Sequence, residues 1–358
     1  MSEIVHGAID TDVHVEPPSI DALKPYLSGY WLEYIRGARS QLGTVYPPSL
    51  PTSARPEARE AGTFPPRDYE TLKAQLLDPY SPRAVILNSV SAFSAGWNPY
   101  YQAAIARAVN EWMANEMLAK DDRLRASICV ALLDPVAAAA EIDRLGSDRR
   151  FVQVMLPIRS ETPWGNVRWQ AIHDACARNN VTMALHAWGQ PGATPTVTGY
   201  ARTHLMDSVS NAQLVGPPQV VSLIAEGVFK RNPGLRVCLQ EVGFNWIHAL
   251  MWRFDKDWRS LWREVPWVTD RPSEYIARNF RATTSPSHIP SWVSSDEVAT
   301  MARFINASEF LMYSSDYPHD HGNDGSERLF EAVGEIGRER IFHENAEAFY
   351  DLNLVSAR

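Results

Sequence analysis

Five polar side chains stand at or just beyond the ends of apolar runs in this sequence. Asp12 and His14 lie two residues apart in IDTDVH, and residues two apart on an extended chain point to the same face. His186 lies near the end of VTMALHAW, Glu241 near the end of LRVCLQEV, and Asp316 directly follows EFLMYSS. Imidazoles and carboxylates are the nitrogen and oxygen donors that suit zinc, manganese or iron. If the fold gathers these five groups, we expect a divalent-metal site.

Eight apolar runs alternate with helix-like segments along the chain, which is the pattern of strand and helix units around a parallel sheet. The predicted strands cover residues 4–15, 83–89, 124–132, 151–157, 181–188, 235–242, 277–284 and 309–315. Apolar residues at helical spacing predict outer helices over 101–120, 169–179 and 220–230. We therefore predict an α/β fold, a (β/α)8 TIM barrel. In such a barrel the carboxyl ends of all strands meet at one mouth, which would bring the five polar groups together.

A Pro-rich stretch separates the first two predicted strands. Residues 46–68 contain six prolines, within an insertion that we expect to cover about 20–78. Long connections of this kind are usually functional, so we expect a lid or a dimer arm rather than a second domain. The sequence thus predicts a single domain over residues 1–358.

Composition excludes several classes of protein. The chain carries 34 basic against 42 acidic side chains, a net charge of -8, which argues against a nucleic-acid binder. No apolar run approaches the roughly 20 residues of a membrane span, and residues 1–10 do not resemble a secretory signal. Three scattered cysteines fit reduced core residues better than disulfides. We expect a cytoplasmic protein that acts on a small molecule and binds neither nucleic acid nor membrane.

Aromatic and imidazole side chains near the strand ends suggest walls for a substrate pocket. They are Trp188, Phe244, Tyr317, His319 and His288. Such a pocket would suit a flat, aromatic or carboxylated substrate. Packing in the core is the competing explanation for the aromatic rings, and an exposed loop position is the competing explanation for the two histidines.

Four sequence motifs carry a resemblance to a known family, and they span nearly the whole chain. They are IDTDVHVEPP, LHAWG, NPGLRVCLQEVGFNWIHALMWRFDKDWR and LMYSSDYPHDHG. In this order they resemble the amidohydrolase superfamily, in the branch of aminocarboxymuconate semialdehyde decarboxylase and resorcylate-type decarboxylases. The resemblance implies a metal held by Asp12, His14, His186 and Asp316, with Asp316 also able to take a proton from metal-bound water. It also implies a homodimer.

The sequence departs from this family in two places. The decarboxylases of the branch usually place a His after strand six, where this chain has Glu241. A carboxylate there could ligate an ion or act as a general base, or it could pair with an arginine as a structural group. Members with two metals carry a bridging lysine on strand four, where this chain has Gln153, Val154 and Met155. A lysine-bridged metal pair is therefore not expected.

Three hypotheses of function follow. The leading one is a metal-dependent hydrolase in which activated water attacks an acyl or similar carbon, with Asp316, Glu241 and His186 as catalytic residues. The second is a metal-dependent, non-oxidative decarboxylase of an aromatic or muconate-like acid. The third is a catalytically silent barrel that serves as a binding scaffold. Zinc is the first expectation for the metal, and no nucleotide or organic cofactor is expected because neither G-x-G-x-x-G after a strand nor a P-loop is present.

Overall fold

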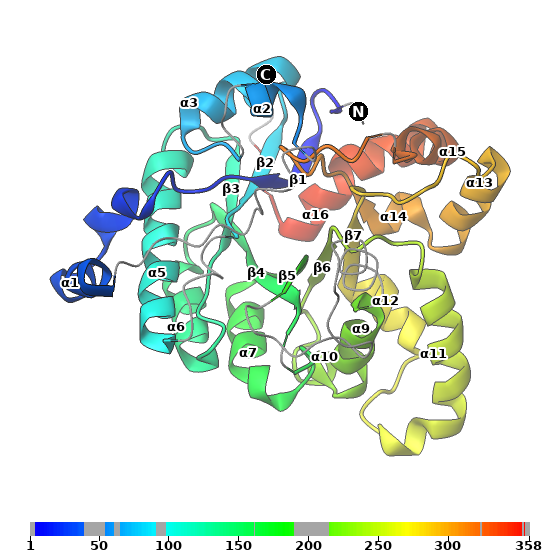
Figure 1. Ribbon diagram of the computed structural model, residues 1–358. Coiled ribbons are helices and arrows are strands. Elements are labelled where there is room, and N and C mark those ends of the chain that lie inside the picture. The colour runs from blue at the N-terminus through cyan, green and yellow to red at the C-terminus, as the bar shows by residue number, and fades with distance from the viewer. Residues whose placement is uncertain are drawn as a thin grey trace.

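Eight parallel strands form the centre of the molecule and run in the order β1 to β8 around one sheet (Figure 1). The computed structural model describes residues 4–38, 54–60, 65–90, 98–160, 162–189, 215–322, 324–352 and 354. The strands are β1 Ile9–His14, β2 Ala84–Asn88, β3 Leu124–Ile128, β4 Phe151–Arg159, β5 Thr182–Gly189, β6 Val237–Gln240, β7 Phe280–Thr283 and β8 Leu311–Met312. All seven neighbouring pairs are parallel, which agrees with the alternation of strands and helices in the sequence.

The first and last strands approach each other and nearly close the sheet. A parallel bridge joins Val13 to Tyr317, and the amide of Thr11 donates to the carbonyl oxygen of Tyr313 at 3.1 Å. Closure removes the exposed edges of the sheet and directs the carboxyl ends of the strands to one mouth. The predicted (β/α)8 TIM barrel is therefore confirmed.

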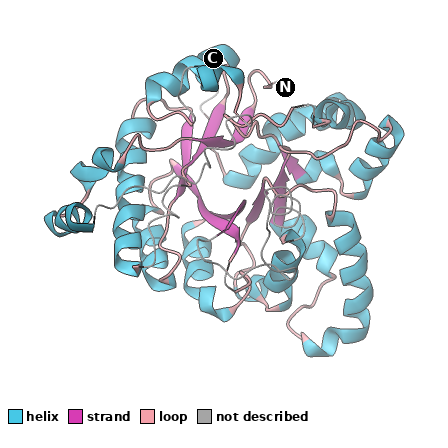
Figure 2. Ribbon diagram, viewed as in Figure 1, coloured by secondary structure: helices cyan, strands magenta, loops and turns pink. Residues whose placement is uncertain are grey.

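Helices surround the strands, as Figure 2 shows. The α-helices are α1 Gly29–Ala38, α2 Pro56–Glu60, α3 Tyr69–Leu72, α4 Asp78–Tyr80, α5 Pro99–Trp112, α6 Pro135–Leu145, α7 Gln170–Asn179, α9 Gly216–Ala225, α10 Val228–Arg231, α11 Ile247–Leu261, α12 Pro272–Asn279, α13 Ser295–Phe304, α14 Ala307–Phe310, α15 Ser326–Glu339 and α16 Asn345–Tyr350. Short 3-10 helices are η1 Ile20–Tyr26, η6 Val167–Trp169 and η7 Trp262–Glu264, and π-helical segments are η3 Lys73–Leu77, η5 Met113–Leu118 and η8 Arg340–Glu344.

Several of the predicted element boundaries were wrong. Strand β1 begins at Ile9 rather than residue 4, because the chain turns at Gly7 with φ of +76°. Residues 277–279 and 309–310 belong to the ends of α12 and α14, since those helices continue to the strand that follows. The predicted helix over 220–230 is divided by Gly227, whose φ of +75° breaks the helical path. Apolar content alone does not separate the last turn of a helix from the first residues of a buried strand.

Polar residues fix the ends of several outer helices. Asp134 begins α6, and its carboxylate accepts from the amides of Val136 and Ala137, both at 3.0 Å. At the other end of a helix, Asn180 adopts the left-handed conformation directly after α7, which asparagine tolerates at a helix end. These ends set where each helix returns to the barrel.

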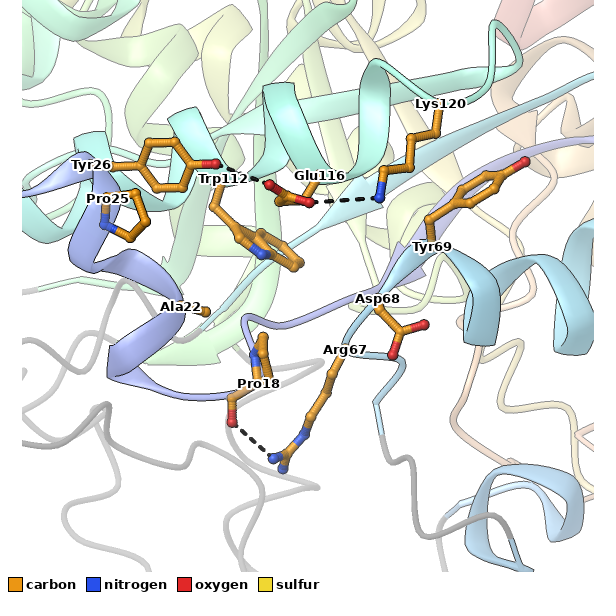
Figure 3. A pocket seen from close by; sticks show the side chains of 10 residues that line it. All are labelled: Pro18, Ala22, Pro25, Tyr26, Arg67, Asp68, Tyr69, Trp112, Glu116 and Lys120. Carbon is orange, nitrogen blue, oxygen red and sulfur yellow. Dashed lines mark hydrogen bonds and ion pairs between the residues drawn. The ribbon is translucent and has the colours of Figure 1, made fainter.

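In the described part of the predicted insertion, η1 and α1 pack against α5. Residues 39–53 and 61–64, which include much of the Pro-rich stretch, lie outside the described residues. A cavity of about 290 Å³ separates the insertion from η5 (Figure 3). At its rim Tyr26 donates to Glu116 at 3.2 Å, and Lys120 lies 3.6 Å from the same carboxylate. Across the cavity Arg67 donates to the carbonyl oxygen of Pro18 at 3.1 Å.

The C-terminal helix α16 covers the end of the barrel opposite the mouth. Phe349 and Tyr350 pack in one apolar cluster with Ile9, Ala84 and Met312, which lie near the starts of their strands. Cys129, Cys176 and Cys238 are free and buried, in agreement with the prediction of reduced core thiols. Among the described helices, none combines the length and the apolar character that crossing a bilayer requires.

Candidate metal centre

The five predicted metal-site residues come from four different strands and meet at the mouth of the barrel. Asp12 and His14 belong to β1 and His186 to β5, whereas Glu241 directly follows β6 and Asp316 lies four residues after β8. Asp12 and Asp316 are completely buried, and the two imidazoles are 1% and 2% exposed. Side chains so far from water need internal partners, so their mutual contacts decide what the site can do.

Glu241 lies at the centre of this group. Its Oε1 atom is 2.9 Å from Nε2 of His14 and 3.0 Å from Nε2 of His186. Oδ1 of Asp316 is 3.1 Å from Nε2 of His14, and the two carboxylate oxygens of Asp12 are each 3.7 Å from one imidazole Nε2. Two sets of four potential ligand atoms each fall within 4.8 Å of one another, one with Asp12 and His186 and one with Asp316. Each set is close enough to be a candidate group of metal ligands.

Two of the carboxylates leave their strands on a strained backbone. Glu241 has a φ of 56° and Asp316 a φ of 55°, both in the left-handed region. For residues other than glycine this conformation costs on the order of 1–3 kcal/mol and is concentrated at functional sites. The backbone therefore turns sharply at both residues, just where each carboxylate joins the cluster at the barrel mouth.

Two buried atoms test whether these residues fit a metal. Oδ2 of Asp12 and Nε2 of His186 lie 3.7 Å apart, and neither has a hydrogen-bond partner. The nearby Glu241 oxygen is close to His186 but does not have hydrogen-bonding geometry toward it. A buried donor or acceptor without a partner costs about 1–3 kcal/mol. A divalent cation would satisfy both atoms, so the donor set and its geometry fit the predicted metal.

Charges within the group shift the pKa values strongly. Burial alone would lower the pKa of His186, but the carboxylates of Glu241 and Asp12 raise it to about 10. Burial raises the pKa of Glu241, whereas the imidazoles of His186 and His14 bring it to about 2. When no ion is present, Glu241 is therefore ionised and His186 is protonated, and a metal must displace the imidazole proton to bind.

Asp316 has two further imidazole partners on the loop that follows it. Nδ1 of His319 lies 2.8 Å from Oδ1, and Nε2 of His321 lies 2.5 Å from Oδ2. Burial acts to raise the pKa of Asp316, but these imidazoles and that of His14 hold it well below its usual range. These contacts orient both oxygens of Asp316, and Oδ1 faces His14.

A sequence model described as "Amidohydrolase" matches residues 9–352, which is almost the entire chain. The chain belongs to the amidohydrolase family. The resemblance to the branch of resorcylate-type decarboxylases is also confirmed, because similar curated proteins carry that name. One is the gamma-resorcylate decarboxylase of Rhodococcus jostii strain RHA1, 26% identical over 306 residues that cover 80% of this chain and 88% of the relative.

Solved structures agree with this amidohydrolase in fold. A 5-carboxyvanillate decarboxylase from Sphingomonas paucimobilis has a TM-score of 0.71 at 19% identity, over 97% of this chain and 99% of the other. A dihydroxybenzoic acid decarboxylase from Polaromonas sp. JS666, solved with manganese and 2-nitroresorcinol, has a TM-score of 0.67 at 18% identity, over 98% of each chain. The prediction of an enzyme of this superfamily, either a hydrolase or a carboxy-lyase, is confirmed at that level.

The predicted pocket residues of this amidohydrolase have different surroundings. His319 contacts Asp316, and its ring lies edge-on to that of His14 with centroids 4.9 Å apart, so it adjoins the ligand cluster. His288 is exposed on the loop after β7. Phe244 and Tyr317 have no exposed surface and pack in the core, so the described contacts favour the structural explanation for these two rings. The side chain of Trp188 lies outside the described part of the chain.

Asn88 is a residue of the site that the sequence analysis did not identify. Asn88 ends β2, is completely buried, and donates from Nδ2 to Oδ1 of Asp12 at 2.5 Å. The signal was present, because Asn88 closes the apolar run AVILN just as His186 stands near the end of its own run. A polar residue at the carboxyl end of a buried barrel strand points to the mouth.

Proposed function

We propose that this amidohydrolase is a metal-dependent, non-oxidative decarboxylase of a small aromatic carboxylic acid. The observation that carries the proposal is the position of Asp316. This buried carboxylate lies 3.1 Å from the ligand imidazole of His14 and is held by His319 and His321 on its other side. The decarboxylase names of the similar curated and solved proteins support the same reaction class.

The reaction needs both a place for the carboxylate and a source of protons. When the bond between the ring and the carboxyl carbon breaks, carbon dioxide leaves and the electron pair stays on the ring carbon, which then takes a proton. A bound divalent ion would supply positive charge that holds the substrate's carboxylate and a neighbouring oxygen. Asp12, His14, His186 and Asp316 would hold that ion.

The chain's own groups can deliver the proton. His319 and His321 both contact Asp316. Three imidazoles keep the pKa of Asp316 low, and the Asp316 carboxylate raises the pKa of His321 against the effect of burial, so the proton of that pair resides on the imidazole. The side chains of these two histidines are 17% and 26% exposed, so they connect the buried carboxylate with solvent. Asp316 then passes a proton from an imidazole to the ring carbon. General acid catalysis of this kind contributes about 10²–10⁴-fold.

Hydrolysis is the second candidate, and Glu241 favours it. Its Oε1 atom is within 3.0 Å of both His14 and His186, so a carboxylate stands inside the cluster. Such a group can accept a proton from water as water attacks an acyl carbon. Decarboxylation requires no attack by water, so the two reactions differ in what enters the product.

The reaction products distinguish the two candidates. The purified enzyme, loaded with manganese or zinc, would be incubated with 2,6-dihydroxybenzoate, 5-carboxyvanillate and simple aryl esters and amides. We expect carbon dioxide release from an aromatic acid, with one deuterium on the ring when the solvent is D₂O. Incorporation of ¹⁸O from labelled water into a product of ester or amide cleavage, without carbon dioxide release from the acids, would overturn the proposal in favour of hydrolysis.

Three finer predictions belong to the same proposal. Zinc was the first expectation for the metal, with manganese and iron as alternatives. The manganese bound in the Polaromonas enzyme supports manganese. Elemental analysis of the protein as purified would identify the ion. Sedimentation analysis would test the predicted homodimer, and fractionation of the source cells would test the predicted cytoplasmic location.

A further inference from the structure

A chain of hydrogen bonds crosses the barrel interior from the C-terminal helix to the metal centre. The hydroxyl of Tyr350 donates to Oε1 of Gln153 at 2.8 Å, and Nε2 of Gln153 donates to Oγ of Ser127 at 2.8 Å. The hydroxyl of Ser127 donates to Oδ1 of Asn88. Nδ2 of Asn88 then donates to Oδ1 of Asp12 at 2.5 Å.

The members of this chain lie deep in the barrel and come from consecutive strands. Asp12, Asn88, Ser127 and Gln153 belong to β1, β2, β3 and β4, and all four are at most 1% exposed. Tyr350 is the last residue of α16 and is 4% exposed. Barrel interiors are usually filled by branched apolar side chains, and buried polar groups cost free energy unless they are bonded. A polar path at this depth is therefore tolerated only because each member bonds the next.

All four bonds of the chain point the same way. Every donor faces toward Asp12, and hydrogen bonds in such a series polarise and strengthen one another. Burial raises the pKa of Tyr350 well above its usual range, so its hydroxyl keeps the proton that begins the series. At the other end, Asn88 occupies Oδ1 of Asp12 and leaves Oδ2 directed at His186, 3.7 Å from its Nε2.

A side branch connects the same network to strand β6. Nε2 of Gln153 also approaches Oε1 of Gln240 at 3.4 Å, and Nε2 of Gln240 donates to the carbonyl oxygen of Thr11 at 2.9 Å. Thr11 adjoins Asp12 in β1, so both the backbone and the side chain of this strand end are held. Gln153 occupies the strand where two-metal relatives carry a lysine, which gives that position a role in this chain.

We propose that Asn88, Ser127, Gln153 and Tyr350 are positioning residues that hold the Asp12 carboxylate ready for the metal. Through them, α16 influences metal affinity from the closed end of the barrel. This inference rests on the metal dependence contained in the proposed function, but not on whether the reaction is decarboxylation or hydrolysis. Loss of an outer partner of a metal ligand typically costs about 10–100-fold in affinity.

The test measures metal binding in single variants of the full-length protein. Dissociation constants for Mn²⁺ would be determined by titration of the metal-free protein, for the wild type and for Asn88→Leu, Ser127→Ala and Tyr350→Phe. We expect about a 10–100-fold loss for Asn88→Leu, which contacts Asp12, and about a twofold to tenfold loss for Tyr350→Phe. The control is Tyr313→Phe, which removes another buried hydroxyl, bonded to the amide of Val5 at 2.8 Å, and should leave Mn²⁺ affinity unchanged.

A double variant shows whether the effect of Tyr350 passes along the chain. If it does, adding Tyr350→Phe to Asn88→Leu causes no further loss of affinity, because the connection is already broken. The visible spectrum of the Co²⁺ form, which reports coordination geometry, should change in Asn88→Leu and in Tyr350→Phe but not in Tyr313→Phe. Circular dichroism of each metal-free variant shows whether it is folded.

Different outcomes contradict different statements. If the wild type binds Mn²⁺ and the folded variants bind it equally well, the positioning role is wrong while the proposed function stands. The positioning role of Tyr350 is also wrong if Tyr350→Phe weakens binding by the same factor with and without Asn88→Leu. Its effect would then not pass through Asn88. If the folded wild type binds no divalent ion, the proposed function fails, and the inference fails with it.

Discussion

Asp316 and Glu241 are carboxylates in one cluster, but their neighbours prepare them for different tasks. Asp316 contacts three imidazoles and is completely buried, whereas the Glu241 side chain is 15% exposed and lies close to the imidazoles of His14 and His186. A carboxylate linked to partly exposed histidines can exchange protons with solvent. A carboxylate between two imidazoles could instead contribute negative charge to a bound ion.

Replacement of Asp316 by Asn tests its role as the proton-transferring group. The amide keeps the size of the side chain but cannot carry the proton, so we expect kcat to fall by at least about 10²-fold. Circular dichroism should show an unchanged fold. Asp320→Asn, on the same loop, is the matched control and should keep nearly full activity. Turnover of Asp316→Asn close to that of the wild type would remove Asp316 from the mechanism.

Replacement of Glu241 by Gln tests whether this residue binds the ion. We expect one ion per chain in the wild type and at least about tenfold weaker binding in the variant, because a negative charge near the ion is lost. Elemental analysis gives the number of ions, and titration of the metal-free protein gives the affinity. The exposed Glu264→Gln is the control. Two ions per chain that become one in Glu241→Gln would instead favour the hydrolase.

At the scale of elements, the last strands of the barrel are short, so other contacts must help to position the site. Strand β8 has only two residues and β7 only four, so pairing between strands is a small part of what holds the mouth. The loops after them are fixed by side chains instead, since the Asp324 carboxylate accepts from the amide of Ser287 at 2.8 Å and from that of Ser326 at 3.0 Å. Polar anchors at loop and helix ends therefore determine how accurately the mouth is built.

The N-terminal cap of α6 gives a measurable case. Asp134 caps two amides of this helix, and its replacement by Ala should lower the free energy of unfolding by about 1 kcal/mol. Urea unfolding of the metal-free protein would measure the loss. Metal affinity should not change, because α6 contributes no residue to the cluster. Val136→Ala, at an exposed position of the same helix, is the control, and an equal loss in both variants would contradict the role of the cap.

At the scale of the whole molecule, the fold buries several ionisable side chains together at the mouth of the barrel. Their protonation therefore affects the stability of the folded protein. Without an ion, the carboxylates and imidazoles stabilise each other as ion pairs, which explains the opposite shifts of His186 and Glu241. The folded metal-free protein should therefore respond to pH mainly through these groups.

We expect the metal-free protein to lose stability as the solution becomes alkaline. The pKa of His186 rises from 6.5 to about 10 on folding, so its contribution is complete below pH 6.5 and is lost as pH rises through 10. Glu241 acts in the opposite direction, since its pKa falls from 4.5 to about 2, and its contribution is lost as pH falls through 2. Thermal unfolding between pH 6.5 and 10 would show the decline. His186→Gln should flatten it, and an identical decline in that variant would contradict the assignment.

Much of this protein is determined by its sequence alone. Alternating strand and helix patterns predict the barrel, because buried parallel strands must be apolar and their connections must be helical. The same patterns place Asp12, His14, His186, Glu241 and Asp316 at strand ends, and the barrel geometry then requires these ends to meet. The local signals of helix termination, such as Asn180, also follow from the chemistry of single residues.

Tertiary structure alone decides which of these groups touch and how. The position of the Glu241 oxygen between two imidazoles depends on a left-handed backbone that no local pattern in the sequence predicts. The path from Tyr350 to Asp12 joins residues 338 positions apart through three other strands, so it exists only when the barrel is closed and α16 is in place. Hydrogen bonds depend on distances of a few tenths of an ångström, and only the packing of the whole barrel sets those distances.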